Sequence, residues 1–380
     1  MLNYEIIIAG AGPSGSAAAI RLANLDPELA QHVLLLDRDF FPRPKLCAGG
    51  VTNDAELILS LLGVGVELPS VPIHISKFVL PTGSLTCQQT GQFKVLRRVE
   101  FDHYLFQTAR ERGIVTQDGE AVENIKCTSD GVLVRTSKDE YRTKILIGAD
   151  GANSTVRRFL KLPRRGRLMM ALEILVPTSE VLIADLIDNM AIFDFSLAGR
   201  RIPGYFWIFP TVHLNPPALS MGMMVAPFRN YKFSSLKNAF TYWLQKQGLD
   251  LNRFELQAHP ALRYQSRASY SQHRVLLVGD AAGIDPLFGE GVTSALALGT
   301  IAAQSAFDAI RKGDFSFSEY EKQIRYSSIG TLMRRRCLLA RKLYERQTTE
   351  RQNLQYETLF NWVAPINPQD ASATITWKPL

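Results

Sequence analysis

The chain has 380 residues, of which 46% are hydrophobic, and a formal net charge of +7 at pH 7. This length predicts two closely joined domains rather than one core, and the composition excludes a disordered protein. No run approaches the ~20 apolar residues that a membrane-spanning helix needs. The cysteines at 47, 87, 127 and 337 include no CxxC pair, so we expect neither a metal site nor a disulfide framework.

Residues 4–9 form an Ile-rich apolar run, which predicts a parallel strand buried on both faces. A G-x-G-x-x-G pattern follows, and residues 17–23 then predict a helix. Such glycines allow a tight turn, close approach to a pyrophosphate and close helix packing, and the helix N-terminus offers N–H groups to phosphate. A Gly-rich turn in an ordinary α/β protein is the alternative. The cofactor-binding residues expected here are Gly10, Gly12, Pro13, Ser14 and Gly15.

A second apolar run, residues 33–36, ends at Asp37. A carboxylate at this place can accept hydrogen bonds from ribose hydroxyls, so we expect Asp37 and the adjacent Arg38 to bind the cofactor. Two later runs, 146–151 and 275–283, also end in Gly and Asp. Three such segments in this order predict an FAD-binding domain that a substrate domain interrupts. Because a buried strand begins at Tyr4, we expect no signal peptide and a cytoplasmic protein.

The later segments resemble the flavoproteins of the para-hydroxybenzoate-hydroxylase fold. Residues 148–151 match their Asp-Gly motif, and residues 279–291 match their Gly-Asp motif. The resemblance implies that Asp280 holds the ribitol hydroxyls and that the loop after it lies against the isoalloxazine. The R-x-x-[FL]-D pattern at 98–102 implies an arginine near the phosphates, which suits its planar fork. The cofactor-binding residues implied are Arg98, Asp150, Gly279, Asp280, Pro286, Gly289, Gly291 and Val292.

Two further stretches resemble the geranylgeranyl reductase family. Residues 41–51 are similar to its R-x-K-x-C-G-G signature, with Ala48 where many members have Gly, and residues 204–210 are similar to its Y-x-W-x-F-P segment. Taken alone, the aromatic run is also typical of a core strand, and a free cysteine is commonly a small buried apolar residue. The resemblance adds four residues near the cofactor, Lys45, Cys47, Ala48 and Gly49.

Together the motifs predict an α/β protein in three parts. The Rossmann-like FAD-binding domain is expected to be discontinuous and to comprise residues 1–75, 98–165 and 268–312. The substrate domain, an antiparallel sheet, is expected at 76–97 and 166–267. Within it we expect strands at 168–176 and 219–225 and a helix at 235–248. The C-terminal region, 313–380, is expected to be helical over 316–360 and irregular from 364.

Basic and apolar residues are interleaved between Arg325 and Arg351, which predicts a basic amphipathic helix. Such a helix can dock on a neighbouring domain, or it can lie on an anionic membrane surface and make the protein membrane-peripheral. Nucleic acid is not expected as a partner, because no stacking platform or reading motif accompanies the charge. The oligomeric state is left open.

The reductase resemblance implies that reduced FAD delivers a hydride to one carbon of a prenyl C=C bond and that an acid protonates the other. An apolar tunnel would hold this small hydrophobic isoprenoid; its expected lining is Phe193, Phe195, Tyr205, Trp207, Phe209 and residues 221–224. The expected catalytic residues are Cys47, Tyr205, Trp207 and Glu290. Cys47, Tyr205 and Glu290 are alternative proton donors, and Glu290 is equally suited to a structural role. Lys45 suits either a substrate diphosphate or FAD.

The electron donor is open between NAD(P)H and a reduced carrier such as ferredoxin, since no second dinucleotide fingerprint is present. An aromatic monooxygenase or halogenase is the alternative function. Residues 204–210 are close to the halogenase motif G-W-x-W-x-I-P, but the surroundings of Lys77, the lysine near the expected catalytic position, do not match. A non-catalytic flavin-binding protein is a third possibility.

Overall fold

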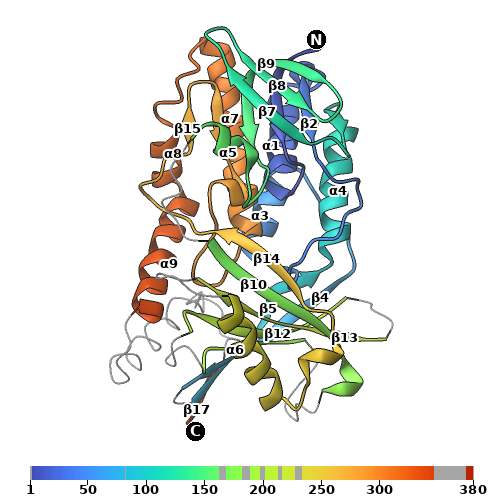
Figure 1. Ribbon diagram of the computed structural model, residues 1–380, viewed down its shortest axis with the longest axis vertical. Helices are drawn as coiled ribbons and strands as arrows, with labels where there is room; N and C mark the ends of the chain where they lie inside the picture. Colours follow the sequence, from blue (N-terminus) through green and yellow to red (C-terminus); the bar gives the residue numbers. More distant parts are fainter. Residues whose placement is uncertain are drawn as a thin grey trace.

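The computed structural model describes residues 2–81, 83–161, 168–181, 189–196, 202–212, 216–226, 233–345 and 374–379. Two sheets organise these residues, and they lie toward opposite ends of the long axis of the molecule (Figure 1). The polar loops that carry the predicted motifs lie between the two sheets, so the fold itself brings them together.

The first sheet is built around β1 (Leu2–Ala9), whose parallel neighbours are β2 (Val33–Leu36) and β9 (Glu140–Gly148). Its strand order is β15-β16-β9-β1-β2-β6. The middle of β1 is fully buried, as an apolar run is in a parallel sheet covered on both faces. The other strands are β6 (Val115–Gln117), β15 (Ser271–Gln272) and β16 (Val275–Leu277), with β7 (Val122–Cys127) and β8 (Val132–Thr136) extending from β9.

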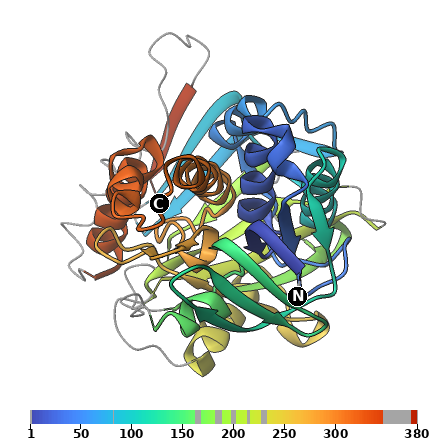
Figure 2. The same cartoon turned by 90° about the horizontal axis from the view of Figure 1, so that it is seen from above.

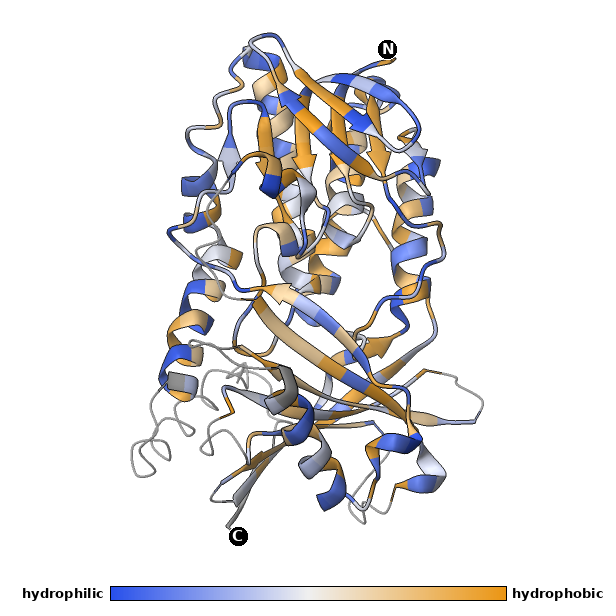
Figure 3. Cartoon of the chain, in the orientation of Figure 1, coloured by the Kyte–Doolittle hydropathy of each residue, from blue (hydrophilic) through white to orange (hydrophobic). Residues whose placement is uncertain are grey.

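Helices pack closely on this sheet. α1 (Pro13–Leu25) lies between α4 (Arg98–Glu111) and α7 (Val292–Lys312), as Figure 2 shows from above. The side chains of residues 17–19, all alanine, are fully buried and leave room for close helix contact. Figure 3 shows how strongly the hydrophobic residues concentrate in the strands of this sheet. The shorter helices are α2 (Pro27–Ala30), α3 (Asn53–Leu61) and α5 (Thr155–Phe159).

The second sheet has the order β14-β10-β13-β12-β11-β4-β5-β17, with β3 paired to the far end of β5. Its pairs are antiparallel except for β11 and β4, which run parallel. Its strands are β3 (Gly50–Thr52), β4 (Ser70–Leu80), β5 (Gly83–Leu96), β10 (Leu168–Pro177), β11 (Met190–Asp194), β12 (Gly204–Pro210), β13 (Ala218–Val225), β14 (Gln257–Leu262) and β17 (Thr374–Pro379).

The two faces of the second sheet bury different sets of side chains. Leu172, Phe206 and Met223 pack on one face against α6 (Phe233–Lys246). The residues next to Phe206 and Met223 in sequence point to the other face. These are Tyr205, Trp207 and Met224, and they pack with the loop around Leu287. Because side chains alternate along a strand, one sheet both closes the substrate domain and presents a wall to the cofactor loops. Three short 3₁₀ turns complete the domain and its border, η1 (Thr178–Glu180), η2 (Leu251–Arg253) and η3 (Gly279–Ala281).

The C-terminal region differs from the prediction in two places. The helix expected over 316–360 is divided into α8 (Tyr320–Tyr326) and α9 (Ser328–Glu345), because Ser327 is extended and its hydroxyl accepts the N–H of Gly330. Residues 346–360 lie outside the described ranges. The tail was expected to be irregular, but its end forms β17 on the edge of β5. Its composition, Thr-Ile-Thr-Trp, favours a strand once an open sheet edge is available.

The predicted fold class is therefore confirmed: a Rossmann-like domain, an interrupting and mainly antiparallel sheet, and C-terminal helices. The exact domain limits stay a prediction. Within the described ranges, no helix combines the length and hydrophobicity that crossing a membrane requires.

Candidate active site

The loop between β1 and α1 brings backbone together where side chains would collide. Gly10 has φ +104°, and a Cβ there would lie 2.3 Å from the carbonyl oxygen of Ala149. A Cβ on Gly15 would lie 1.8 Å from the carbonyl oxygen of Gly10. Gly12 precedes α1 and offers no side-chain cap, and Pro13 begins the helix. The first N–H groups of α1 are thus available to a pyrophosphate, so the loop fits FAD.

Asp37 closes this loop from the end of β2. Its buried carboxylate accepts the N–H of Ala11 at 2.7 Å and of Asp39 at 3.0 Å, and burial raises its pKa. A carboxylate has about four acceptor positions, so ribose hydroxyls can still be bound. Arg38 points to solvent instead, and its Nε lies 3.6 Å from Asp39 Oδ2.

A buried carboxylate, Asp102, organises the basic residues of the site. Arg98 binds it through two hydrogen bonds, of 2.8 and 3.0 Å, and Arg43 Nη2 approaches it at 3.2 Å. Burial lowers the pKa of Arg98, but Asp102 and a hydrogen bond to Cys47 outweigh this and raise it. Arg43 Nε also lies 4.0 Å from Asp37 Oδ1, so the carboxylates hold both guanidinium groups in place where the phosphates are expected.

A second basic cluster joins the loop that carries Lys45 and Cys47, called the Cys47 loop below, to the second sheet. Lys45 Nζ contacts His259 Nε2 on β14. Burial lowers the pKa of both groups, that of His259 to about 4, while the charge of Asp280 acts in the opposite direction. His259 is therefore neutral at pH 7 and accepts a hydrogen bond from the Lys45 ammonium. The charge of Asp280, the residue expected to hold the ribitol, thus acts on both Lys45 and His259.

The loop from Asp285 to Gly291 is held at three points. The fully buried Asp285 accepts the N–H groups of Leu287 and Phe288 at 2.8 and 3.2 Å, and Arg336 of α9 donates to it at 3.0 Å. The Tyr205 hydroxyl donates to the Phe288 carbonyl at 2.7 Å. The third point is the Tyr344 hydroxyl of α9, which donates to the Leu287 carbonyl, also at 2.7 Å. The predicted flavin loop is thus fixed by the substrate sheet and by the C-terminal helix.

α7 begins directly after this loop, at Val292. Gly291 supplies no side-chain cap, and the Glu290 carboxylate accepts the N–H of Thr293 at 2.8 Å. Glu290 also lies 3.7 Å from Arg336, and burial raises its pKa. The positive end of this long helix faces the same space as the loop and favours negative charge there.

An aromatic wall faces the loops from the second sheet. The ring centroids of Phe193 and Phe209 are 5.1 Å apart, and those of Phe195 and Tyr205 are also 5.1 Å apart. Trp207 lies across Gly222, where a Cβ would come within 2.1 Å of its ring. Edge-to-face and stacked rings of this kind form a rigid apolar surface.

One buried acid interrupts the wall. Glu173 of β10 accepts a hydrogen bond from the Ser220 hydroxyl, which in turn accepts the Trp207 indole N–H at 2.9 Å. It also accepts the backbone N–H of Cys47, and burial raises its pKa to about 6. The Cys47 side chain is exposed. Through its hydrogen bonds with Ser220 and Cys47, Glu173 links the Cys47 loop to the predicted aromatic segment.

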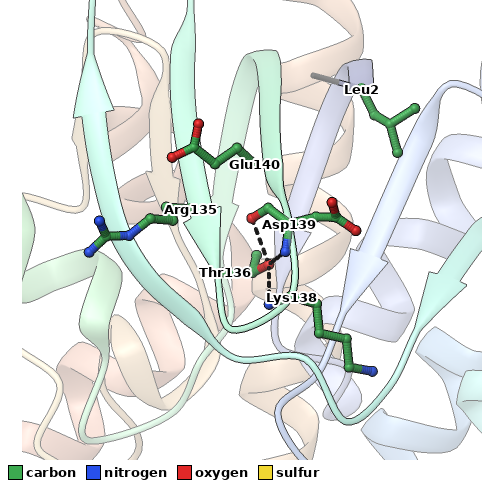
Figure 4. A pocket seen from close by; sticks show the side chains of 6 residues that line it. All are labelled: Leu2, Arg135, Thr136, Lys138, Asp139 and Glu140. Atoms are coloured by element: carbon green, nitrogen blue, oxygen red, sulfur yellow. Dashed lines mark hydrogen bonds between the residues drawn. The ribbon is translucent and has the colours of Figure 1, made fainter.

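Asp150 follows β9 and lies against the first glycine loop, since a Cβ on Gly10 would come within 2.9 Å of its backbone nitrogen. Asp150 caps α5 by accepting the N–H groups of Thr155 and Val156 at 2.6 and 3.0 Å. A separate surface hollow is lined by Leu2, Arg135, Thr136, Lys138, Asp139 and Glu140 (Figure 4). It lies on the β8–β9 turn of the first sheet and contains none of the predicted site residues.

Among the described residues, no group of three or more His, Cys, Asp or Glu side chains is placed to hold a metal.

Sequence reasoning missed the roles of Glu173, His259 and Arg336. A signal existed for Glu173, since it is the one charged residue in the ten-residue strand Leu168–Pro177, and acids are rarely buried without a partner. No comparable signal existed for His259 or Arg336, because each acts across a contact between segments far apart in the sequence.

Comparison with known proteins defines the class. The sequence profile of the FAD binding domain family matches residues 3–297, so the chain belongs to that family. It is 31% identical to an uncharacterized protein of Methanosarcina barkeri, over 83% of this chain and 77% of that protein. It is 27% identical to the digeranylgeranylglycerophospholipid reductase of Methanosphaerula palustris, over 92% and 88%. A geranylgeranyl bacteriochlorophyll reductase-like structure from Thermoplasma acidophilum has the same fold, with a TM-score of 0.79, 21% identity and coverage of 97% and 98%.

Within the FAD-binding class, the chain is an FAD-dependent oxidoreductase of the geranylgeranyl reductase family, as its two motif stretches predicted. The structure gathers Lys45, Cys47, Asp280 and Tyr205 between the two sheets. The role of each remains a prediction.

Gly12→Val tests the pyrophosphate loop. A Cβ at Gly12 meets no atom closer than Arg43 Nη2 at 3.5 Å, so the variant should fold, but the side chain would fill the approach to the phosphates. We expect loss of bound FAD, measured by the flavin absorbance of the purified protein. Gly65→Val, at a glycine with open space around it, is the matched control. Full flavin occupancy in Gly12→Val would contradict the assignment.

Glu173→Gln tests the burial of this acid through stability. The pKa of Glu173 is raised, so its proton stabilises the folded state fully below about pH 4.5, and this contribution is lost as pH rises through about 6. Relative to the variant, the wild type should lose about 2 kcal/mol of unfolding free energy between these limits. Urea unfolding at several pH values measures this. A difference that does not change with pH would refute the raised pKa.

Arg336→Met tests the ion pair between Arg336 and Asp285, which restrains the flavin loop. The variant keeps the aliphatic stem but leaves the buried Asp285 with only its backbone donors. We expect a loss of about 2 kcal/mol in unfolding free energy and weaker FAD binding, measured by fluorescence titration. Lys342→Met, at an exposed position of α9, is the control. Equal FAD affinity in both variants would show that this ion pair does not support the cofactor site.

Proposed function

We propose that this protein reduces C=C bonds of a geranylgeranyl-type prenyl lipid or diphosphate. The observation that carries the proposal is the aromatic wall of β11 and β12, which faces the Cys47 loop and the flavin loop from one side. An isoprenoid chain offers only apolar surface and weakly polarisable double bonds, and such a wall complements it. The names of the curated relatives point to the same class of substrate.

Several groups are suited to holding FAD. The N-terminus of α1, Arg98 and Arg43 would hold the phosphates, and Asp37 and Asp280 would hold the ribose and ribitol hydroxyls. When bound and reduced, FAD supplies a hydride, and the protein supplies position and a dry environment. An isolated C=C bond has no oxygen that a hydrogen-bond donor could polarise. The chain must therefore act mainly by holding the bond in place and excluding water.

The predicted proton donors differ in their surroundings. Burial raises the pKa of Tyr205 far above its usual range, and its hydroxyl already donates to the Phe288 carbonyl. Tyr205 is therefore suited to shaping the wall and restraining the loop. Glu290 is engaged by Thr293 and Arg336 at the start of α7. The Cys47 side chain is exposed and interacts with Arg98, and its exposure favours contact with substrate.

The position of Lys77 disfavours a halogenase. Its neighbours along β4, Ile75 and Val79, pack toward α6, whereas Phe78 packs in the aromatic wall. By strand alternation, Lys77 lies on the face turned away from Tyr205 and Trp207. The structure offers no comparable observation in favour of an aromatic monooxygenase.

The electrons come, in this proposal, from NAD(P)H or from a reduced carrier such as ferredoxin. The exposed face of α9 carries Arg335, Lys342 and Leu338. That mixture suits an acidic carrier or an anionic lipid surface. Its apolar face docks on the protein through Met333 and Leu343.

An anaerobic experiment tests the reaction itself. The bound flavin is reduced, geranylgeranyl diphosphate is added, and the oxidised flavin spectrum is followed while the product is weighed by mass spectrometry. We expect reoxidation and a gain of two hydrogens for each reduced double bond. A flavin that stays reduced until oxygen is admitted would reject the proposal and favour the monooxygenase or halogenase alternative.

Cys47→Ala tests the loop that faces the wall. The side chain is exposed, so the variant should fold and retain FAD, but prenyl reduction should slow by about tenfold or more if the thiol touches the substrate. The rate of anaerobic flavin reoxidation measures this. Unchanged turnover would assign Cys47 a purely structural role.

A further inference from the structure

Glu173 occupies an unusual place in the second sheet. It lies in the middle of β10, opposite Gly222 of β13 and Gln257 of β14, and only 6% of it is exposed. Its neighbours Leu172 and Ile174 pack toward α6. Strand alternation therefore turns the carboxyl group toward the face that holds Tyr205 and Trp207.

The hydrogen bonds around Glu173 leave acceptor positions on its carboxyl group without a protein donor. The Trp207 indole N–H can only donate, so Ser220 Oγ accepts it and turns its own hydrogen to Glu173 Oε1. The N–H of Cys47 is the other donor to this carboxyl group. Two donors occupy two of the about four acceptor positions, and Oε1 is fixed as an acceptor. A proton on Glu173 is therefore carried by Oε2, on the side away from Ser220.

The charged and titratable groups that face Glu173 come from three elements. Cys47 and Lys45 lie on the loop above it, His259 lies on β14, and Tyr205 lies on β12. Burial, not one of these charges, is the main cause of its raised pKa. His259 is neutral and Lys45 is engaged with it, and neither group is among the causes of the raised pKa of Glu173.

We propose that Glu173 holds the proton that the reduction consumes. This role rests on the proposed function. In each reduction the C=C bond gains a hydride, which reduced FAD provides, on one carbon and a proton on the other. Glu173 gives that proton from Oε2 to a chain lying along the aromatic wall, becomes a carboxylate, and takes a proton from water before the next cycle. The Ser220 hydroxyl, which the Trp207 N–H orients, holds Oε1 as an acceptor and so leaves Oε2 to carry the proton.

The first test needs no substrate. Infrared spectra of the flavin-loaded protein are recorded from pH 4 to 8, where the C=O stretch of a buried carboxylic acid is separate from that of a carboxylate. We expect one acid band that disappears with a midpoint of about 6 and is absent in Glu173→Gln. Glu120→Gln, which removes a buried carboxyl group of the first domain, should keep this band. No Glu173-dependent band would overturn the proposal.

The second test follows the anaerobic reoxidation of the reduced protein by geranylgeranyl diphosphate. The wild-type rate should fall about tenfold for each pH unit above about 6, whereas Glu173→Gln should be slower by about a hundredfold at pH 6 and lose this pH dependence. Flavin content should be unchanged at pH 6. Ser220→Ala should keep the acid but shift the midpoint of the rate profile, which a merely structural Ser220 would not do.

The outcomes separate the two proposals. If Glu173→Gln retains the wild-type rate and pH profile, Glu173 does not supply the proton and the role is rejected. If the wild type itself is not reoxidised at any pH, the proposed reaction fails, and the catalytic role of Glu173 fails with it. The infrared titration then still decides whether Glu173 carries a proton in this site.

Discussion

The structure depends on the close meeting of three backbone turns, which is possible because glycine stands at the points of contact. Gly10 and Gly15 allow the turn after β1 to touch Ala149 at the end of β9, and Gly279 lets the turn after β16 rest on Ser14, where a Cβ would come within 2.4 Å of the Ser14 hydroxyl. The parallel strands deliver these turns to one edge of the sheet. The first N–H groups of α1 can therefore approach a pyrophosphate directly, while the side chains of Asp37 and Asp280 are available for the ribose and ribitol hydroxyls.

The second sheet serves two purposes because its side chains alternate. One face completes an ordinary core with α6, and the other supplies aromatic rings, Ser220 and Glu173 to the space near the cofactor loops. A change on the α6 face therefore acts on stability, while a change one residue away acts on the site. Lys77 and Phe78 illustrate this separation, since they are adjacent in sequence and belong to opposite faces.

The sequence was sufficient for the features that depend on local patterns. Glycine spacing gave the loop before α1, apolar runs gave β1, β9 and β16, and the aromatic segment gave β12. It was insufficient for contacts that chain folding creates. The Arg336–Asp285 pair joins α9 to a loop 51 residues earlier, and Lys45 meets His259 across 214 residues. β17 was missed because a strand of this length forms only when an edge such as that of β5 is available.

The contacts that α9 makes with the flavin loop extend the cofactor site beyond the part of the chain that matches the family. The family match ends at residue 297, inside α7, which runs to Lys312. The side chains that restrain the Asp285 loop, Arg336 and Tyr344, come from still farther along the chain. The stretch that the family profile matches is therefore shorter than the stretch whose side chains restrain the flavin loop. A change at Arg336 or Tyr344 would reach that loop directly, although both residues lie outside the matched stretch.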